Sequence, residues 1–486
     1  MDASSSTLAW AQETFGHVAF PDRRNVDLAV RVAAGLCERP FAQVSKAFPD
    51  EAMRQAVYDL LEHPRCHASA LAEAAARATA RAAAAYDVAL VALDGVSLTL
   101  RDPNDRRGTG SVGRRSKGAR GLEALDAVAS TPGGAVLGLA GLVVWARSHQ
   151  PNERPSRQRP VHERELGAWL ELRARVRQAF ALGAPRTRRV LLHDSGADAW
   201  PVLLDVLAND GDPNEVSVVR AAQDRCAHAP DRPDEPGYLR ALLARAAQRQ
   251  RRWVWLPAGH GRPARRARLE LTTRPVTLTL TLTPRGGRRE VTLRAIAVRE
   301  LGRVPPGQKR LEWVLLTDEL ARTLKAAWRV VGWYGLRWRV EDQHKAWKKG
   351  GGDIEDMRLG HPATMAKWMV WHAAVAARAL SLVHHARDPA RQGEPAASAF
   401  SAHELEALRL VRARYGRTTP TSLTVREAVE LLASLGGYNR QAGRRPGPLV
   451  VGRGLELIAV VAAALDVQAE EARAGERPKR GKIPKN

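Results

Sequence analysis

The chain has 486 residues, enough for two or three domains with substantial hydrophobic cores. It carries 76 Lys and Arg residues against 52 Asp and Glu, a formal net charge of +24. This excess indicates a polyanionic partner such as DNA, although binding to a ribosome or a membrane surface could produce it too. The chain lacks an 18-residue apolar run and a secretory signal pattern, and its three cysteines are scattered, so we expect a soluble cytoplasmic protein without a disulfide framework.

Residues 1–75 have the pattern of short helices. One amphipathic helix is predicted to start at Arg23 and Arg24, just after Pro21 and Asp22. Arginines at a helix start can hold DNA phosphates, which favours a DNA-binding module. A helical cap on a larger domain fits the composition almost as well.

Two short apolar strands are each predicted to end on an aspartate. The run 87–94 ends on Asp94, and the run 188–194 ends on Asp194. Such an acid either forms a turn or points inward as a ligand. Strands and amphipathic helices alternate in this part of the chain, which is typical of a mixed α/β layer.

Three neighbouring features complete this region. The strand predicted at 215–221 carries Arg220. Asp198 is expected in the first turn of a helix at 200–207, where an acid is favoured. Residues 101–121 are basic and rich in glycine, which predicts a loop that contacts a polyanion.

Residues 223–317 predict a β-rich, basic insertion. Alternating apolar and polar residues on both sides of a PRGG turn at 284–287 predict a hairpin, and a strand at 311–318 carries Trp313. Beyond the glycines at 350–352, helices are predicted at 363–385, 404–414, 425–434 and 454–465, followed by a basic tail at 476–486.

The stretch 333–349 separates into two faces when it is placed on a helix. Tyr334, Arg337, Glu341 and Lys348 fall within an arc of roughly 60°, with Trp338 and Lys345 at its border and Leu336, Val340 and Trp347 on the far side. Gly335 predicts a bend nearby. A surface helix with charge pairs four residues apart is the simpler interpretation.

The spacing Y-x2-R-x3-E-x6-K resembles the YREK signature of the IS-four-type, Tn-five-like bacterial DNA transposases, which are DDE enzymes. R-W-R-V-E and H-K-A-W-K nearby are also similar to that family, and D-S-G-A-D at 194–198 is similar to its D-R-E-A-D motif. The resemblance implies an RNase H-like α/β core with a β-rich insertion and helical domains at both ends. It implies an end-binding domain at 1–75, a catalytic domain at 76–375 and a dimerisation domain at 376–486.

The resemblance also implies the chemistry. Asp94, Asp194 and Glu341 would be the catalytic acids and would hold two Mg²⁺ ions, for which Mn²⁺ substitutes. The enzyme would nick transposon ends, form and resolve a DNA hairpin, and join the free 3′-OH to target DNA. Its partners would be the terminal inverted repeats, target DNA and a second copy of the chain, in the bacterial cytoplasm at the nucleoid.

The same resemblance implies a set of DNA contacts. Trp313 and Trp338 offer flat surfaces for an unstacked base, with packing in the core as the alternative for Trp313. The cations and the phenol would hold phosphates: Tyr334, Arg337, Lys345, Lys348, Arg220, Arg23 and Arg24. Two other functions remain open, a nuclease without strand transfer and a DNA-binding protein that has lost catalysis.

Overall fold

The computed structural model describes residues 6–102, 107–113, 118–147, 160–207, 212–256, 263–282, 287–349, 353–388, 391–439 and 445–475. Parts of the predicted basic loop, most of the PRGG turn, the glycines at 350–352 and the basic tail lie outside these residues. No helix in the described ranges is long and apolar enough to cross a membrane.

The N-terminal part is helical, as predicted. Its elements are α1 (Ser6–Phe15), α2 (Arg23–Glu38), α3 (Val44–Ala47), α4 (Glu51–Glu62) and α5 (Ala68–Ala83). Aspartates cap two of these helices, because Asp22 accepts a hydrogen bond from the Arg24 amide and Asp50 accepts one from the Met53 amide. Such caps satisfy amide groups that have no partner within the helix.

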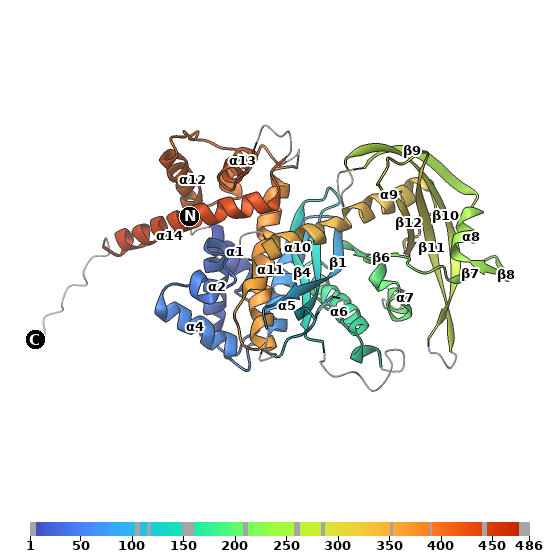
Figure 1. Ribbon diagram of the computed structural model, residues 1–486, viewed down its shortest axis with the longest axis horizontal. Helices are drawn as coiled ribbons and strands as arrows, with labels where there is room; N and C mark the ends of the chain where they lie inside the picture. The colour runs from blue at the N-terminus through green and yellow to red at the C-terminus, as the bar shows by residue number, and fades with distance from the viewer. Residues whose placement is uncertain are drawn as a thin grey trace, which may run out of the picture.

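One large mixed sheet runs through the molecule, which confirms the predicted mixed α/β class (Figure 1). Its strands are β1 (Val88–Thr99), β2 (Gly110–Ser111), β3 (Arg120–Ser130), β4 (Val136–Trp145), β5 (Arg188–His193), β6 (Glu215–Arg220), β7 (Cys226–Ala229), β8 (Arg232–Tyr238), β9 (Gln248–Leu256), β10 (Arg265–Thr281), β11 (Arg288–Leu301) and β12 (Glu312–Thr317). The order is β2-β3-β1-β5-β6-β12-β11-β10-β7-β8, with β4 on β3 and β9 on β10.

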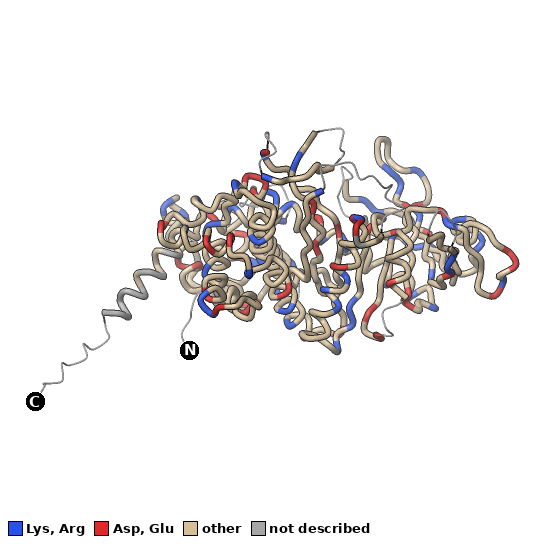
Figure 2. The backbone as a smooth tube through the Cα atoms, turned by 90° about the horizontal axis from the view of Figure 1, so that it is seen from below, with Lys and Arg blue, Asp and Glu red and all other residues tan. Residues whose placement is uncertain are grey.

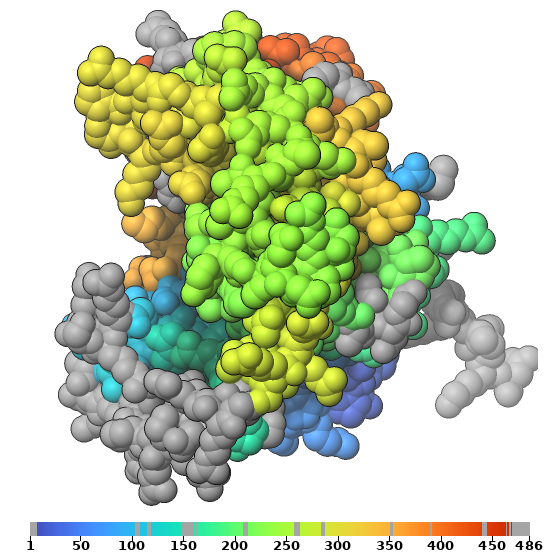
Figure 3. All heavy atoms as spheres, turned by 90° about the vertical axis from the view of Figure 1, so that its right-hand side faces the viewer, coloured from blue at the N-terminus to red at the C-terminus, as the bar shows by residue number. Residues whose placement is uncertain are grey.

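Strands β1, β5 and β6 pair in parallel, whereas β3 pairs antiparallel with β1. The β-rich segment continues the same sheet, because β12 pairs with β6 and leads through β11 to β10. It forms one end of the molecule together with α8 (Leu239–Ala244) (Figures 1 and 3). Lys and Arg lie along both the helical end and this β-rich end (Figure 2).

Helices cover both faces of the sheet. On one face lie α5, α6 (Glu165–Gly183), α7 (Trp200–Leu207) and α8. On the other lie α9 (Leu324–Gly335), the 3₁₀ turn η5 (Leu336–Trp338) and α10 (Arg339–Lys349). Since side chains alternate along a strand, Leu90 and Ala92 of β1 face α9 and α10, and Val91 faces α5 and α6. A 3₁₀ turn, η5, follows Gly335 and separates α9 from α10, and the bend expected there stays a prediction.

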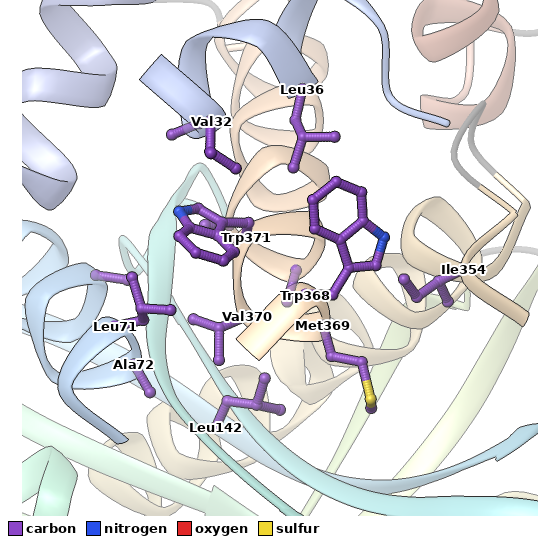
Figure 4. Packing of buried hydrophobic residues seen from close by; sticks show 14 of the residues in the cluster. Val32, Leu36, Leu71, Ala72, Leu142, Ile354, Trp368, Met369, Val370 and Trp371 are labelled. Carbon is purple, nitrogen blue, oxygen red and sulfur yellow. The ribbon is translucent and has the colours of Figure 1, made fainter. Parts of the chain in front are cut away.

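The remaining helices are α11 (Pro362–His385), α12 (Ala402–Arg414), α13 (Val425–Leu435) and α14 (Pro448–Gly475), with short 3₁₀ helices η3 (Val161–Glu163), η4 (Ser195–Ala197), η6 (Ile354–Asp356) and η7 (Ala396–Ser398). Helix α14 is longer than the predicted 454–465. The tryptophans Trp368 and Trp371 of α11 are fully buried against α2, α5 and β4 (Figure 4). The N-terminal helices therefore share a core with α11.

Two predicted positions are wrong in detail. Asp94 lies inside β1 and not at its end, because β1 continues to Thr99 along β3 after its pairing with β5 stops at Leu93. Asp198 lies before α7 and not in its first turn. Its buried carboxylate accepts hydrogen bonds from the Ala222 and Gln223 amides, which fixes the segment after β6.

Candidate active site

The three predicted acids lie on one face of the sheet. Asp94 is in β1, and Asp194 follows β5 directly and caps η4 by accepting a hydrogen bond from the Gly196 amide at 2.8 Å. Because side chains alternate along a strand, both aspartates point to the same face of the sheet as the neighbouring residues that pack against α9 and α10. Glu341 lies in the first turn of α10 on that face. Asp94 and Asp194 are adjacent in the sheet because the parallel β1–β5 pairing ends with Leu93 beside His193.

Arg337 joins two of these acids. Its guanidinium donates one hydrogen bond to Asp94 Oδ2 at 2.8 Å and another to Glu341 Oε1 at 2.6 Å. The Arg337 side chain is only 9% exposed. Burial by itself lowers the pKa of Arg337, but the charges around it, Asp94 first among them, raise that pKa overall. Arg337 therefore stays a cation between two carboxylates.

Asp194 belongs to the same electrostatic site. Burial raises the pKa of its carboxyl group, and the negative charge of Asp94 raises it further. The Gly196 amide and the charge of Arg337 act in the opposite direction. Asp94, Asp194 and Glu341 thus lie around one buried guanidinium, with two acids close enough for like-charge repulsion.

These carboxylates do not form an open cage. Within the described ranges, no group of three or more His, Cys, Asp or Glu side chains is arranged to hold a metal ion. The position between Asp94 and Glu341 is filled by the Arg337 guanidinium. A divalent cation bound by both acids would therefore compete with Arg337.

Tyr334 and Trp313 lie beside this site. Tyr334 of α9 is buried, and burial raises its pKa to about 12, so the phenol keeps its proton at neutral pH. Its ring meets Trp313 of β12 edge-on, with ring centroids 5.1 Å apart. Trp313 is half-buried, and its ring lies on the face of α9, whereas the nearby pocket of about 230 Å³ that includes Arg249 and Arg299 lies on the opposite face, under α8. Trp313 thus packs on the core on the same face of the sheet as Tyr334.

The other members of the motif take different positions. Lys348 donates to the Ser97 carbonyl oxygen at 2.7 Å and pairs with Glu355 at 3.0 Å. Lys345 is exposed and pairs with Asp342. Trp338 is half-buried, and the Arg337 guanidinium lies 5.4 Å from its ring centroid.

The remaining predicted DNA contacts fall in two places. Arg220, at the end of β6, is close enough for its charge to lower the pKa of Tyr334, so it belongs to the active-site region. Arg23 and Arg24 lie at the start of α2, which packs against α1, α4, α11 and α14. Both are exposed and pair with neighbouring acids, Asp27 and Asp22.

Two residues at the site received no role in the sequence analysis. Asp126 of β3 is fully buried, and His344 of α10 binds it, with Nε2 and Oδ1 2.7 Å apart. Asp126 is the register partner of Asp94. The sequence could have indicated Asp126, because it is an acid inside the apolar strand at 122–130. Its pairing with His344 could not be predicted from the sequence.

The N-terminal helices match a known family. Residues 7–66 match the family model described as transposase DNA-binding. The matched segment runs from α1 past the end of α4 and does not include the three acids. The match supports a transposase with DNA as its partner.

Proposed function

We propose that this protein is a cut-and-paste DNA transposase of the IS-four type with an RNase H-like catalytic core. One observation carries the proposal: Arg337 links Asp94 to Glu341 on the sheet face that also presents Asp194. The mixed sheet with helices on both faces supports the RNase H-like assignment. The transposase DNA-binding match supports DNA as the substrate.

The acids suit a pair of Mg²⁺ ions, with Mn²⁺ as a substitute. Mg²⁺ prefers a few carboxylate oxygens together with water and substrate phosphate. The site already balances Asp94 and Glu341 with one cation, Arg337, and the like-charge repulsion felt by Asp194 favours additional positive charge. Asp94, Asp194 and Glu341 would hold the ions, whose chemistry is activation of the attacking oxygen and stabilisation of the leaving oxygen.

The cations around the acids would bind the DNA backbone. If Asp94 and Glu341 held a divalent ion, the Arg337 guanidinium would be available for a bidentate contact with phosphate. Tyr334 is protonated at neutral pH, so its hydroxyl can donate a hydrogen bond to the same DNA strand as Arg337. Lys348, Lys345 and Arg220 would neutralise neighbouring phosphates.

Trp313 is the proposed surface for a base flipped out of the transposon end, and Trp338 is a second one. The ring of Trp313 packs edge-on against Tyr334 on the sheet face that carries the three acids, so a base stacked on it would lie near the proposed metal ligands. Arg23 and Arg24 at the start of α2 would contact end DNA by exchanging their acidic partners for phosphates. Those exposed ion pairs are weak, and exchange costs little.

We further propose that the active form is a homodimer on DNA, in which the C-terminal helices make the contact. A nuclease without strand transfer and a DNA-binding protein without catalysis are the competing functions. Incubating purified protein with the DNA ends of its own element and Mg²⁺ separates the three. Joined products support the transposase, cleavage alone supports the nuclease, and retardation without cleavage supports the binding protein.

The first variant to test is Asp194→Ala. We expect it to reduce Mg²⁺-dependent end cleavage at least 1,000-fold, or roughly 4 kcal/mol of barrier, because the carboxylate is proposed as a ligand, and to leave end binding nearly unchanged. Gel-resolved cleavage and mobility shift measure the two effects. Asp87→Ala is the matched control, since Asp87 is an exposed acid just before β1. Cleavage by Asp194→Ala at the rate of this control would contradict the assignment.

A further inference from the structure

The pair formed by Asp126 and His344 connects the sheet to the helix that carries Glu341. The His344 side chain is 12% exposed and that of Asp126 is 0% exposed. The second carboxylate oxygen of Asp126 has no hydrogen-bond partner among the described residues. His344 therefore provides the charge balance that the structure shows for this buried acid. A buried acid that lost such a partner would be left uncompensated, which is costly.

This buried acid lies directly beside the proposed metal ligand Asp94. The antiparallel register of β1 and β3 sets Asp94 opposite Asp126, and the alternation along both strands points the two side chains to the face covered by α10. Like charges directly opposite each other are destabilising. Burial raises the pKa of Asp126, the charge of His344 lowers it, and the charge of Asp94 raises it. His344 thus offsets a repulsion that would otherwise act on Asp94.

The pair also fits a regular set of contacts between α10 and the sheet. Val340 is buried in a cluster with Ala92 and Val128, and Lys348 reaches the Ser97 carbonyl oxygen. His344 lies midway between these contacts, four residues from each. Four residues along a helix rise about 6 Å, and two residues along a strand rise about 6.7 Å. Each further turn of the helix therefore meets the next residue on the same face of the strand.

The polar contacts fix the position of α10 along the strands more strictly than the apolar contact of Val340 does. The Val340 contact is apolar and non-directional, so it tolerates small shifts of the helix along the strand. The hydrogen bond from His344 to Asp126 has a defined length and direction and does not. Glu341 lies on the same helix, less than one turn before His344. A shift of α10 would therefore move the Glu341 carboxylate relative to Asp94.

We infer that Asp126 and His344 are positioning residues that lock α10 onto β3 and so set the separation of the Asp94 and Glu341 carboxylates for a shared divalent cation. This inference rests on the proposed metal-dependent function and extends it to two residues outside the YREK spacing. The two residues act through Asp94 and Glu341 and do not contact the cation. Partners that orient metal ligands in this way typically change metal affinity 10- to 100-fold when they are removed.

The test measures Mn²⁺ binding to the purified full-length protein without DNA, by the loss of the free Mn²⁺ electron paramagnetic resonance signal. His344→Leu removes the hydrogen bond and fills the position with an apolar side chain; we expect it to weaken Mn²⁺ binding about tenfold. His344→Gln retains a donor and should stay within about threefold of the wild type. Rescue by Gln but not by Leu would be the signature of a hydrogen bond that positions the helix.

A double-mutant cycle tests whether the two residues act as a pair. Asp126→Leu combined with His344→Leu should weaken Mn²⁺ binding by clearly less than the product of the two single effects. The matched control is His385→Leu, which breaks a histidine–glutamate pair in which His385 Nε2 lies 2.9 Å from Glu394. It should leave Mn²⁺ affinity unchanged. Thermal unfolding of every variant reports whether the protein still folds.

Three results would overturn the inference: His344→Leu binds Mn²⁺ like the wild type, His385→Leu weakens binding equally, or the two single effects simply multiply. Should the Leu variants not fold, the comparison rests on His344→Gln against His344→Asn, whose shorter amide cannot reach Asp126. Asp94→Ala and Glu341→Ala separate this inference from the proposed function. If they abolish Mn²⁺ binding while His344→Leu does not, only the positioning role fails; if they leave binding intact, the metal site itself fails.

Discussion

The role expected for Arg337 from the sequence differs from the contacts that it makes in the structure. In the sequence it is one of several cations at helical spacing and is expected to contact phosphate. In the structure it is buried and bonded to two carboxylates, one of them 243 positions away in the chain. A buried guanidinium needs such partners, because its charge loses the solvation of water. The same contacts keep Asp94 and Glu341 side by side before any cation binds.

A second buried carboxyl group allows a test of stability at this scale. Asp318 follows β12, and burial raises its pKa to about 6 even though it accepts a hydrogen bond from the Ser217 amide at 2.7 Å. An unfolded chain has an aspartate pKa of about 3.9. Asp318 therefore favours the folded state fully below about pH 4, and this contribution is lost as pH rises through about 6.

We expect Asp318→Asn to stabilise the protein at pH 8 by roughly 1–3 kcal/mol, because the amide accepts the same hydrogen bond without the cost of ionisation. The gain should vanish near pH 4, where the wild-type carboxyl group is protonated. Thermal unfolding at both pH values measures the difference. Asp87→Asn, at an exposed acid, is the control. A gain that is the same at both pH values would show that burial of charge is not the cause.

At the scale of elements, the break between α9 and α10 places the motif. The 3₁₀ turn at 336–338 winds more tightly than an α-helix, so the residues on its two sides leave the straight helical phase. Tyr334 before the turn packs against Trp313 of β12, and Glu341 after it faces Asp94. One helical segment thereby joins the β-rich part of the sheet to the acids of its central strands.

Trp313 of β12, which packs against Tyr334, can be tested by substitution. If it receives a flipped base, Trp313→Ala should slow hairpin formation about 5- to 150-fold, corresponding to the roughly 1–3 kcal/mol of base stacking, with less effect on the first nick. Trp313→Phe keeps a flat ring on Tyr334 and should act nearly like the wild type. Time courses of nicked and hairpin DNA measure both steps. Equal losses at both steps would indicate that Trp313 serves mainly in core packing.

At the scale of the whole molecule, the N-terminal helices and the sheet share one hydrophobic core. The matched segment 7–66 shares a core with α5, β4 and α11, through the tryptophans Trp368 and Trp371. The β-rich segment extends the same sheet that carries Asp94. A DNA molecule held by the N-terminal helices would therefore be held by a body that includes the candidate active site.

The net charge of +24 leads to a prediction for DNA binding. End binding should weaken steeply with salt, and replacing both Arg23 and Arg24 by Ala should reduce the slope of log K against log salt by about two, if each contacts one phosphate. Fluorescence anisotropy over a range of salt concentrations measures the slope. Arg417→Ala, an exposed arginine after α12, is the control. An unchanged slope in the double variant would exclude the start of α2 from the DNA contact.

The sequence by itself determined the features that depend on short stretches of chain. Apolar runs, alternation and helical spacing predicted most helices and strands and the mixed α/β class, because these follow from local backbone geometry. The acids Asp94, Asp194 and Glu341 could be selected only through the family resemblance, since many acids are present.

Only the tertiary structure decided which side chains meet. The partnership of Arg337 with Asp94, that of His344 with Asp126, and the continuation of the sheet from β6 into β12 all join residues separated by about a hundred positions or more. No local periodicity records such contacts, because they depend on strand register and on how helices settle on the sheet. The burial of Tyr334 and the interior position of Asp94 in β1 follow from the same long-range pairing.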